Sequence, residues 1–203
     1  MLRLDESTDE ITDRLPAGNA IGVAPAGDKL WIVGDTVLTV DPTTNKRTLV
    51  FDPHNPIPRD NADSNGGDMA AIGQSLYLVG CGGAVFRIDP TTHVPTIAPL
   101  HQSGPCRTVA ADGALWVTGT GEDGTGLLRK LDPKRLRITT NVTVGSHPAG
   151  VAYGAGSLWV ANSGDGTVMR IDPATEQIVA TIYVGGAPYD LAFTHGLVWV
   201  TIV

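Results

Sequence analysis

A short apolar segment with an aromatic residue at its centre recurs five times along the sequence. The five aromatic residues lie 39 to 46 residues apart and are Trp31, Tyr77, Trp116, Trp159 and Trp199. After each of the first four comes a second recurring segment, which ends at Asp and usually Pro, as in Met169 to Pro173. Self-similarity at a spacing of about 20 to 50 residues is typical of chains that fold as arrays of one unit. The fold is therefore expected to be built from copies of one such unit.

One complete repeat contains four short segments with strand-like alternation and none with the period of a helix. In the copy with the clearest alternation, the expected strands are residues 148–153, 157–162, 167–172 and 177–183. The second and third strands are separated by Ser163-Gly164-Asp165-Gly166, which has the residue types of a tight hairpin turn. Four antiparallel strands in roughly 40 residues, repeated, are typical of a β-propeller blade. The sequence therefore predicts an all-β fold, a β-propeller of four-stranded antiparallel blades.

The two ends of the chain each hold half a repeat. Residues 2–5 and 11–15 match a third and fourth strand, whereas residues 189–193 and 197–203 match a first and second strand. Four complete repeats lie between them, so the two halves add up to a fifth blade. We predict a single propeller domain over residues 1–203, with five blades and a ring closed by two strands from each end. Closure removes exposed strand edges, so a closed ring is expected to be a monomer. The alternative is that the chain is part of a larger propeller.

The segment Ser157 to Thr175, followed by Ile178 to Ile182 and Val184 to Pro188, resembles the YVTN-type propeller repeat. This repeat type is related to the NHL-repeat and virginiamycin B lyase-like propellers. The resemblance covers nearly the whole chain, and it is strongest in residues 145–203 and weakest in residues 43–75. It implies the propeller fold. For function it implies a range that includes binding modules, sensors, surface-layer components and some enzymes.

Polar residues recur where the first strand of each repeat is expected to begin. The positions in register are Gly22, Asp68, Arg107, Gly150 and Asp190, with His147 and Tyr189 close to two of them and Asn162 at the end of a second strand. In a propeller these positions surround one mouth of the central channel, and polar groups that converge in a concave mouth are the usual form of a ligand site. The alternative is that they are polar only because water fills the channel.

These residues lead us to predict a non-catalytic binding or scaffold module that uses the channel mouth. The candidate ligand-binding residues are Asp68, Arg107, His147, Asn162, Tyr189 and Asp190. Because Arg107 is expected between two acidic neighbours, the predicted partner is a small polar or zwitterionic ligand, a peptide terminus or a protein.

The competing prediction is a metal-assisted lyase or hydrolase with His147 and Asp68 as ligands or bases. The virginiamycin B lyase-like resemblance implies His and Glu side chains around a divalent metal. Here the second strand of the repeat with His147 ends in Ala161-Asn162, and no repeat has Glu at that position. An elimination needs a base within reach of the proton that it removes, so the lyase activity is not transferred to this chain.

Residues 52–67 depart most from the repeat. Asn61, Asp63 and Asn65 have the spacing of oxygen ligands in a calcium loop, but Ile72 stands where such a loop has its acidic twelfth residue. A divalent cation such as calcium is therefore one alternative and a solvated loop is the other, and no further cofactor is expected.

Cys81 and Cys106 are expected on one face of adjacent blades, either as a disulfide or as two thiols. A disulfide would imply an extracytoplasmic location.

The net charge is −7 and no run of basic residues occurs. A protein that binds the nucleic-acid backbone needs a positive surface, so we expect no nucleic-acid partner. No apolar run is long enough to span a membrane, and the first residues lack the pattern of a signal peptide. These observations leave the compartment open.

Overall fold

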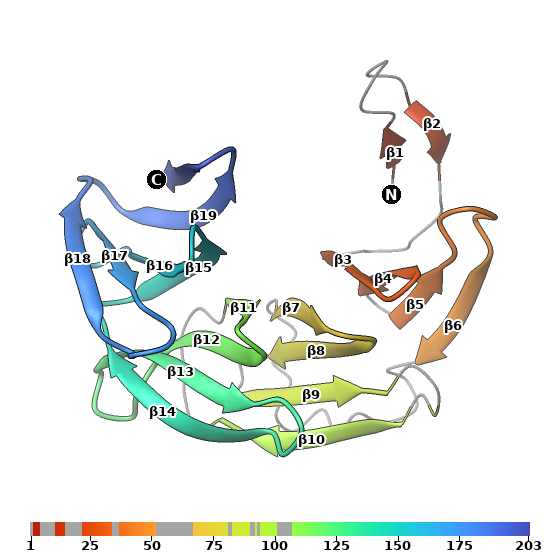
Figure 1. Cartoon of the computed structure of the whole chain (residues 1–203), viewed down its shortest axis with the longest axis horizontal. Coiled ribbons are helices and arrows are strands. Elements are labelled where there is room, and N and C mark those ends of the chain that lie inside the picture. The colour runs from red at the N-terminus through yellow and green to blue at the C-terminus, as the bar shows by residue number, and fades with distance from the viewer. Residues whose placement is uncertain are drawn as a thin grey trace. The chain divides into compact units, whose positions relative to one another are not determined.

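The computed structural model describes residues 2–4, 11–14, 22–33, 37–51, 67–80, 83–89, 92, 94–100 and 107–203. The chain divides into two compact units, Met1–Ile57 and Pro58–Val203, and each is described by itself. Every regular element in the described residues is a β-strand (Figure 1).

The first unit contains two antiparallel sheets. One pairs β1 (Leu2–Leu4) with β2 (Ile11–Arg14). The strands of the other, in spatial order, are β3 (Gly22–Ala26), β4 (Lys29–Val33), β5 (Val37–Val40) and β6 (Arg47–Phe51). Since spatial order equals chain order, each strand pairs with the next one along the chain.

The described residues of the second unit form three four-stranded sheets and one two-stranded sheet, all antiparallel. The strands of the first sheet are β7 (Gly67–Ile72), β8 (Ser75–Gly80), β9 (Ala84–Ile88) and β10 (Pro95–Pro99). Those of the second are β11 (Thr108–Ala111), β12 (Ala114–Thr120), β13 (Gly126–Asp132) and β14 (Arg137–Thr143). Those of the third are β15 (Pro148–Gly154), β16 (Ser157–Asn162), β17 (Thr167–Ile171) and β18 (Ile178–Tyr183). The two-stranded sheet pairs β19 (Pro188–Thr194) with β20 (Leu197–Ile202).

These sheets confirm the predicted repeat of four antiparallel strands. In the repeat that begins at Pro148, each observed strand begins and ends within one residue of its predicted bounds. The two-stranded sheets β1–β2 and β19–β20 match the predicted half repeats in chain position and in strand number. Closure of the ring by pairing these halves stays a prediction, as does the single-domain organisation.

The recurring Asp after the third strand forms a turn through its carboxylate. Asp172 follows β17, and its Oδ1 accepts hydrogen bonds from the backbone N–H groups of Ala174 (2.8 Å) and Thr175 (3.3 Å). These bonds lower the pKa of Asp172, because they stabilise the charged carboxylate. Asp132 forms the same arrangement after β13. The Asp of the repeat therefore ends the third strand and caps the turn into the fourth.

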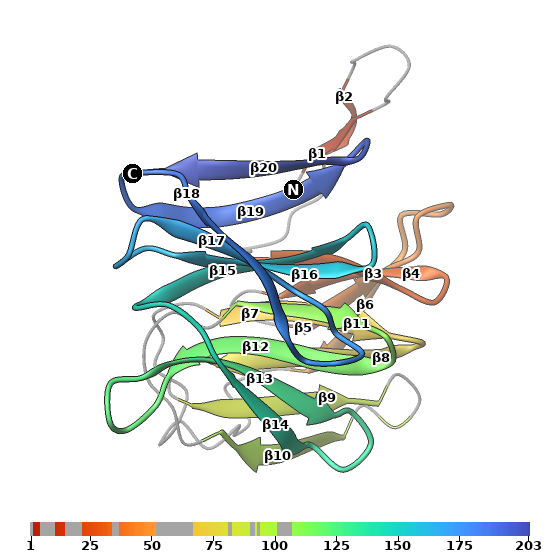
Figure 2. The same cartoon turned by 60° about the vertical axis from the view of Figure 1, so that its left-hand side comes forward.

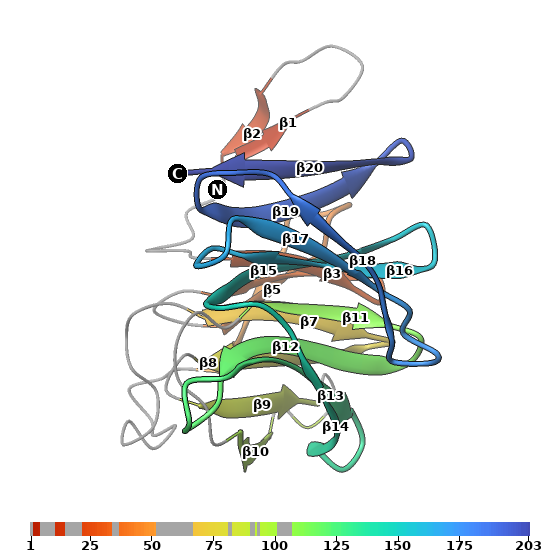
Figure 3. The same cartoon turned by 90° about the vertical axis from the view of Figure 1, so that its left-hand side faces the viewer.

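The core of the second unit lies between consecutive sheets. Trp116 and Leu128 come from one sheet, and Leu158, Val160 and Ile171 come from the next, and these side chains form one buried cluster. Figures 2 and 3 show the sheets β11–β14, β15–β18 and β19–β20 as successive layers of this unit. The apolar residues of each strand that recur in sequence are thus the ones that hold neighbouring sheets together.

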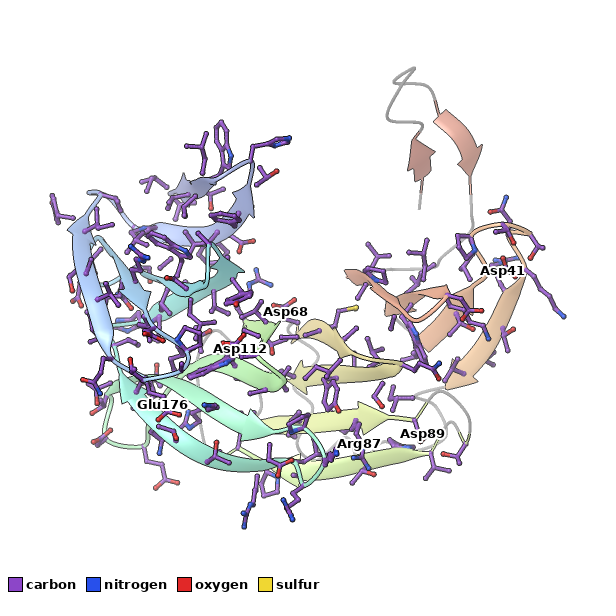
Figure 4. All side chains as sticks on the ribbon, in the orientation of Figure 1. Asp41, Asp68, Arg87, Asp89, Asp112 and Glu176 are labelled. Carbon is purple, nitrogen blue, oxygen red and sulfur yellow. The ribbon has the colours of Figure 1, made fainter. Side chains whose placement is uncertain are left out.

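A basic residue of the third strand lies over the aromatic residue of the second strand in two sheets. Lys130 Nζ is 5.2 Å from the centre of the Trp116 ring, and Arg170 Cζ is 5.6 Å from the centre of the Trp159 ring. Lys130 Nζ also forms an ion pair of 2.8 Å with Oε1 of Glu176, which follows β17 in the next sheet. Figure 4 labels Glu176 at this junction. The pair therefore links two consecutive sheets at their surface.

Within the described ranges, no helix has the length and hydropathy needed to cross a membrane.

Candidate functional site

The first strands of the four sheets in the second unit lie next to one another. β7 contacts β11, β11 contacts β15, and β15 contacts β19. Four polar residues at the beginnings of these strands form what we call the inner-strand cluster, which consists of Asp68, Arg107, Tyr189 and Asp190. The sequence predicted all four as mouth residues, and the structure brings their side chains or charges close enough to interact.

Asp68 connects the beginnings of two first strands. Its Oδ1 accepts a hydrogen bond from the backbone N–H of Met69 (2.9 Å), and its Oδ2 accepts one from the backbone N–H of Thr108 in β11 (2.8 Å). Figure 4 labels Asp68 where β7 and β11 meet. Partial burial raises the pKa of Asp68 above its usual value, although both hydrogen bonds and the charge of Arg107 lower it. The negative charge of Asp190 adds to the increase.

Gly150 allows β19 to come close to β15. A Cβ atom at Gly150 would lie 2.8 Å from the carbonyl oxygen of Tyr189 and 2.9 Å from the Cα of Asp190. Both neighbours are backbone atoms, which cannot move aside as the end of a side chain can. The absence of a side chain at Gly150 therefore places Tyr189 and Asp190 near the other members of the inner-strand cluster.

Arg107 reaches from the beginning of β11 to Tyr189 at the beginning of β19. Its guanidinium carbon is 5.8 Å from the centre of the Tyr189 ring, a distance at which a cation is attracted to the ring face. The sheet between them contains Gly150 in its first strand, which is the residue that β19 approaches at Tyr189 and Asp190. Among the described residues, no carboxylate forms an ion pair with Arg107.

A threonine of the second strand fixes the backbone at two members of the cluster. Thr118 Oγ1 accepts a hydrogen bond from the N–H of Arg107 (3.0 Å), and Thr201 Oγ1 accepts one from the N–H of Asp190 (2.9 Å). Each Thr lies eleven residues after the residue that it holds. Neither threonine was among the predicted site residues, although the same offset of eleven residues in two repeats is a signal in the sequence that could have identified them.

His147 and Asn162 lie at the same end of their sheet but make different contacts. The carbonyl oxygen of His147 accepts a hydrogen bond from the backbone N–H of Ser163 (3.0 Å), so His147 is tied to the hairpin turn after β16. The exposed His147 ring has its Nδ1 2.8 Å from Ser146 Oγ. Neither contact joins it to the inner-strand cluster.

Asn162 is fully buried rather than exposed at the mouth. Its Nδ2 donates a hydrogen bond to Thr167 Oγ1 (3.1 Å), and its Oδ1 is buried without a partner. A Cβ at Gly145 would lie 2.7 Å from the Asn162 Cγ, so the chain before β15 covers this side chain. Asn162 thus packs inside the end of its sheet and offers no exposed group to a ligand.

The predicted calcium-loop residues Asn61, Asp63 and Asn65 lie outside the described residues, as do Cys81 and Cys106. In the part of the chain that the structure describes, no three His, Cys, Asp or Glu side chains are grouped as metal ligands.

The described residues also line an open cavity of about 350 Å³ beside the turn between β11 and β12. Three of its four charged residues have side-chain partners: Lys130 pairs with Glu176, Asp132 caps its own turn, and Asp112 Oδ1 accepts a hydrogen bond from Tyr153 Oη (3.2 Å). The fourth, Lys134, is exposed at the surface. The inner-strand cluster, where Arg107 has no such ion pair, is the better candidate for a binding site.

Comparison with known proteins gives information on the fold. No protein-family model matches the chain, and no curated protein matches it. Similar solved structures include apo AztD from Citrobacter koseri, with 16% identity, a TM-score of 0.62, and coverage of 92% of this chain and 53% of that one. The WD40 domain of Toxoplasma gondii coronin has 14% identity and a TM-score of 0.65, and the alignment covers 85% of this chain and 48% of that one.

A chain of a nidogen/laminin complex has 15% identity and a TM-score of 0.67, and the alignment covers 99% of this chain and 80% of that one. This chain therefore spans about half the length of the AztD and coronin chains and four fifths of the chain from the nidogen/laminin complex. At these identities the likeness concerns the fold alone. The sheets and these neighbours together confirm that the chain has the predicted fold, an all-β propeller of four-stranded antiparallel blades.

Proposed function

We propose that this chain is a non-catalytic binding or scaffold module that holds a small polar ligand, or a peptide or protein partner, at the inner-strand cluster. The observation that carries the proposal is the position of the Arg107 guanidinium, which lies 5.8 Å from the centre of the Tyr189 ring and forms no ion pair with any described carboxylate. A guanidinium has five N–H donors, and the contact with a ring face uses none of them in a hydrogen bond. These donors are available to a partner.

The fold neighbours give independent support of a general kind. One is a chain in a nidogen/laminin complex, and another is a chain in a mitotic checkpoint complex with 13% identity and a TM-score of 0.70. Those propellers are found in assemblies with other proteins. The same architecture in this chain is compatible with a role in holding a partner.

Within this proposal we place the chain among the YVTN-type propellers. The support is the segment from Ser157 to Thr175, whose residues form β16, the hairpin turn and β17, with the Asp172 turn after them. No observation favours the lyase or hydrolase alternative, since His147 and Asp68 make their hydrogen bonds in separate places.

The proposal is tested by selection from a phage-displayed library of random peptides on immobilised wild-type protein, with Arg107→Met as the counter-selection. We expect peptides that bind the wild type and lose affinity about tenfold or more on Arg107→Met, as is typical when a charged hydrogen-bonding group is removed. Arg137→Met is the matched control, because Arg137 is exposed on β14. Selected peptides that bind Arg107→Met as well as the wild type would contradict the proposed site.

A further inference from the structure

We propose that the inner-strand cluster recognises a zwitterion of the α-amino acid type, whose carboxylate binds Arg107 and whose ammonium group binds Asp190. This inference rests on the proposed function and names the ligand class of the same site. It follows from which polar atoms of the cluster already form hydrogen bonds with other described residues and which do not.

Arg107 is the anchor for the carboxylate. The Arg107 guanidinium carbon lies 5.8 Å from the centre of the Tyr189 ring, and none of the hydrogen bonds found among the described residues uses its side-chain N–H groups. The edge of a guanidinium presents paired donors in the geometry that matches the two oxygens of a carboxylate. Tyr189 is 44% exposed, and its ring lies within the distance at which it attracts the guanidinium, so that part of the conformational freedom of Arg107 is already reduced before binding.

The two aspartates differ in the oxygens that they leave open. Asp68 uses both carboxylate oxygens to accept backbone N–H groups, at 2.9 Å and 2.8 Å. Asp190 is exposed, and its Oδ1 accepts the N–H of Leu191 at 2.9 Å, whereas none of the hydrogen bonds found among the described residues involves its Oδ2. Asp190 is therefore the member that can accept a hydrogen bond from a ligand, and Asp68 contributes charge.

The balance of charge selects a zwitterion over a simple anion. The cluster contains one guanidinium and two carboxylates, and Asp68 is close enough to Arg107 and Asp190 to be influenced by both charges. An anion such as phosphate would be attracted by Arg107 and repelled by both aspartates. A ligand that carries one carboxylate and one ammonium group adds no net charge and pairs with both Arg107 and Asp190.

The test uses isothermal titration calorimetry with the free α-amino acids, their N-acetyl and carboxamide derivatives, and inorganic phosphate. We expect one or more free amino acids to bind the wild type, and the matching carboxamide to bind about tenfold or more weakly because the charged hydrogen bonds to Arg107 are lost. Arg107→Met is expected to lose affinity to a similar extent. Asp190→Asn is expected to lose the preference for the free amine over the N-acetyl form.

Two controls separate binding from folding. Arg137→Met is expected to bind as the wild type does, and Arg107→Met is expected to keep the wild-type near-UV circular dichroism spectrum, because no hydrogen bond or ion pair of the Arg107 side chain within the described residues is lost. The inference is overturned if no amino acid binds, if phosphate binds more tightly than every amino acid, or if Asp190→Asn leaves the preference unchanged.

These outcomes are distinguishable from failure of the proposed function. Peptides from the library that require Arg107, combined with no binding of free amino acids, would overturn the zwitterion inference and leave the binding module in place. If no ligand of either kind requires Arg107, both proposals fail.

Discussion

At the residue scale, the aspartates of the repeat divide into two groups according to hydration and hydrogen bonding. Asp41 lies close to water, and hydrogen bonds from the hydroxyl of Thr43 (2.6 Å) and from the backbone N–H of Thr43 (2.8 Å) lower its pKa to about 2. Asp68 accepts two backbone N–H groups as well, yet partial burial outweighs them and raises its pKa. The direction of each shift thus follows from whichever is larger, the cost of burying the charge or the hydrogen bonds that stabilise it.

Asp68 gives a pH-dependent contribution to stability with a defined sign. Because its pKa in the folded state lies above the ordinary value of 3.8, the folded chain binds more protons than the unfolded chain between the two values. The stability gained from protonated Asp68 is full below pH 3.8 and is lost as the pH rises through the folded pKa. We therefore expect the unfolding free energy of the wild type, minus that of Asp68→Asn, to fall as the pH rises from 3.8. Urea unfolding of both proteins over this range measures the difference, and an increase with pH would contradict the assignment.

At the element scale, the strands and turns of one repeat follow from local sequence. Alternation predicts strands, and Gly166 adopts a φ of 65° in the predicted hairpin turn. The same local pattern failed to predict the environment of Asn162, since alternation describes the two faces of a strand but not which segment covers its end. Gly150 was predicted only as a position in register, although its contact with β19 decides where Tyr189 and Asp190 lie.

Gly150→Ala is expected to separate β15 from β19. The new Cβ would lie within 2.9 Å of two backbone atoms of β19, and overpacking of this kind costs about 1 to 3 kcal/mol of unfolding free energy. We also expect weaker binding at the inner-strand cluster, because Tyr189 would move away from Arg107. Gly80→Ala is the matched control, since its Cβ would have no neighbour among the described residues closer than 3.8 Å. Equal stability of the two variants in urea unfolding would show that β19 does not press on Gly150.

At the scale of the whole molecule, stability comes from side chains that pack between sheets. Trp116 of one sheet and Leu158 of the next are fully buried in the same cluster. By contrast, Trp199 in the two-stranded sheet β19–β20 is 60% exposed, although it occupies the same repeat position as Trp116. A residue in a given repeat position is therefore buried only where a neighbouring sheet covers it.

Leu158→Ala is expected to lower the unfolding free energy by about 2 to 5 kcal/mol, because it leaves a cavity between two sheets. Val179→Ala in β18 is the matched control, since Val179 is 54% exposed and its replacement is expected to change the free energy by about 0.5 kcal/mol or less. Thermal and urea unfolding of both variants measure these changes. A Leu158→Ala variant as stable as Val179→Ala would mean that the two sheets do not share a packed core.

The amino-acid sequence by itself determined the repeat, the four strands of a complete repeat, the hairpin turns and the set of residues at the beginnings of the first strands. Each of these depends on the period of apolar residues or on turn chemistry over a few neighbouring residues. Only the tertiary structure decided that Arg107 meets Tyr189, that Gly150 admits β19, and that Asn162 is buried while His147 lies apart from the inner-strand cluster. Each of these features is a contact, or the lack of one, between residues of different sheets or segments. Such contacts depend on how closely the sheets pack, and no local pattern within one repeat specifies that packing.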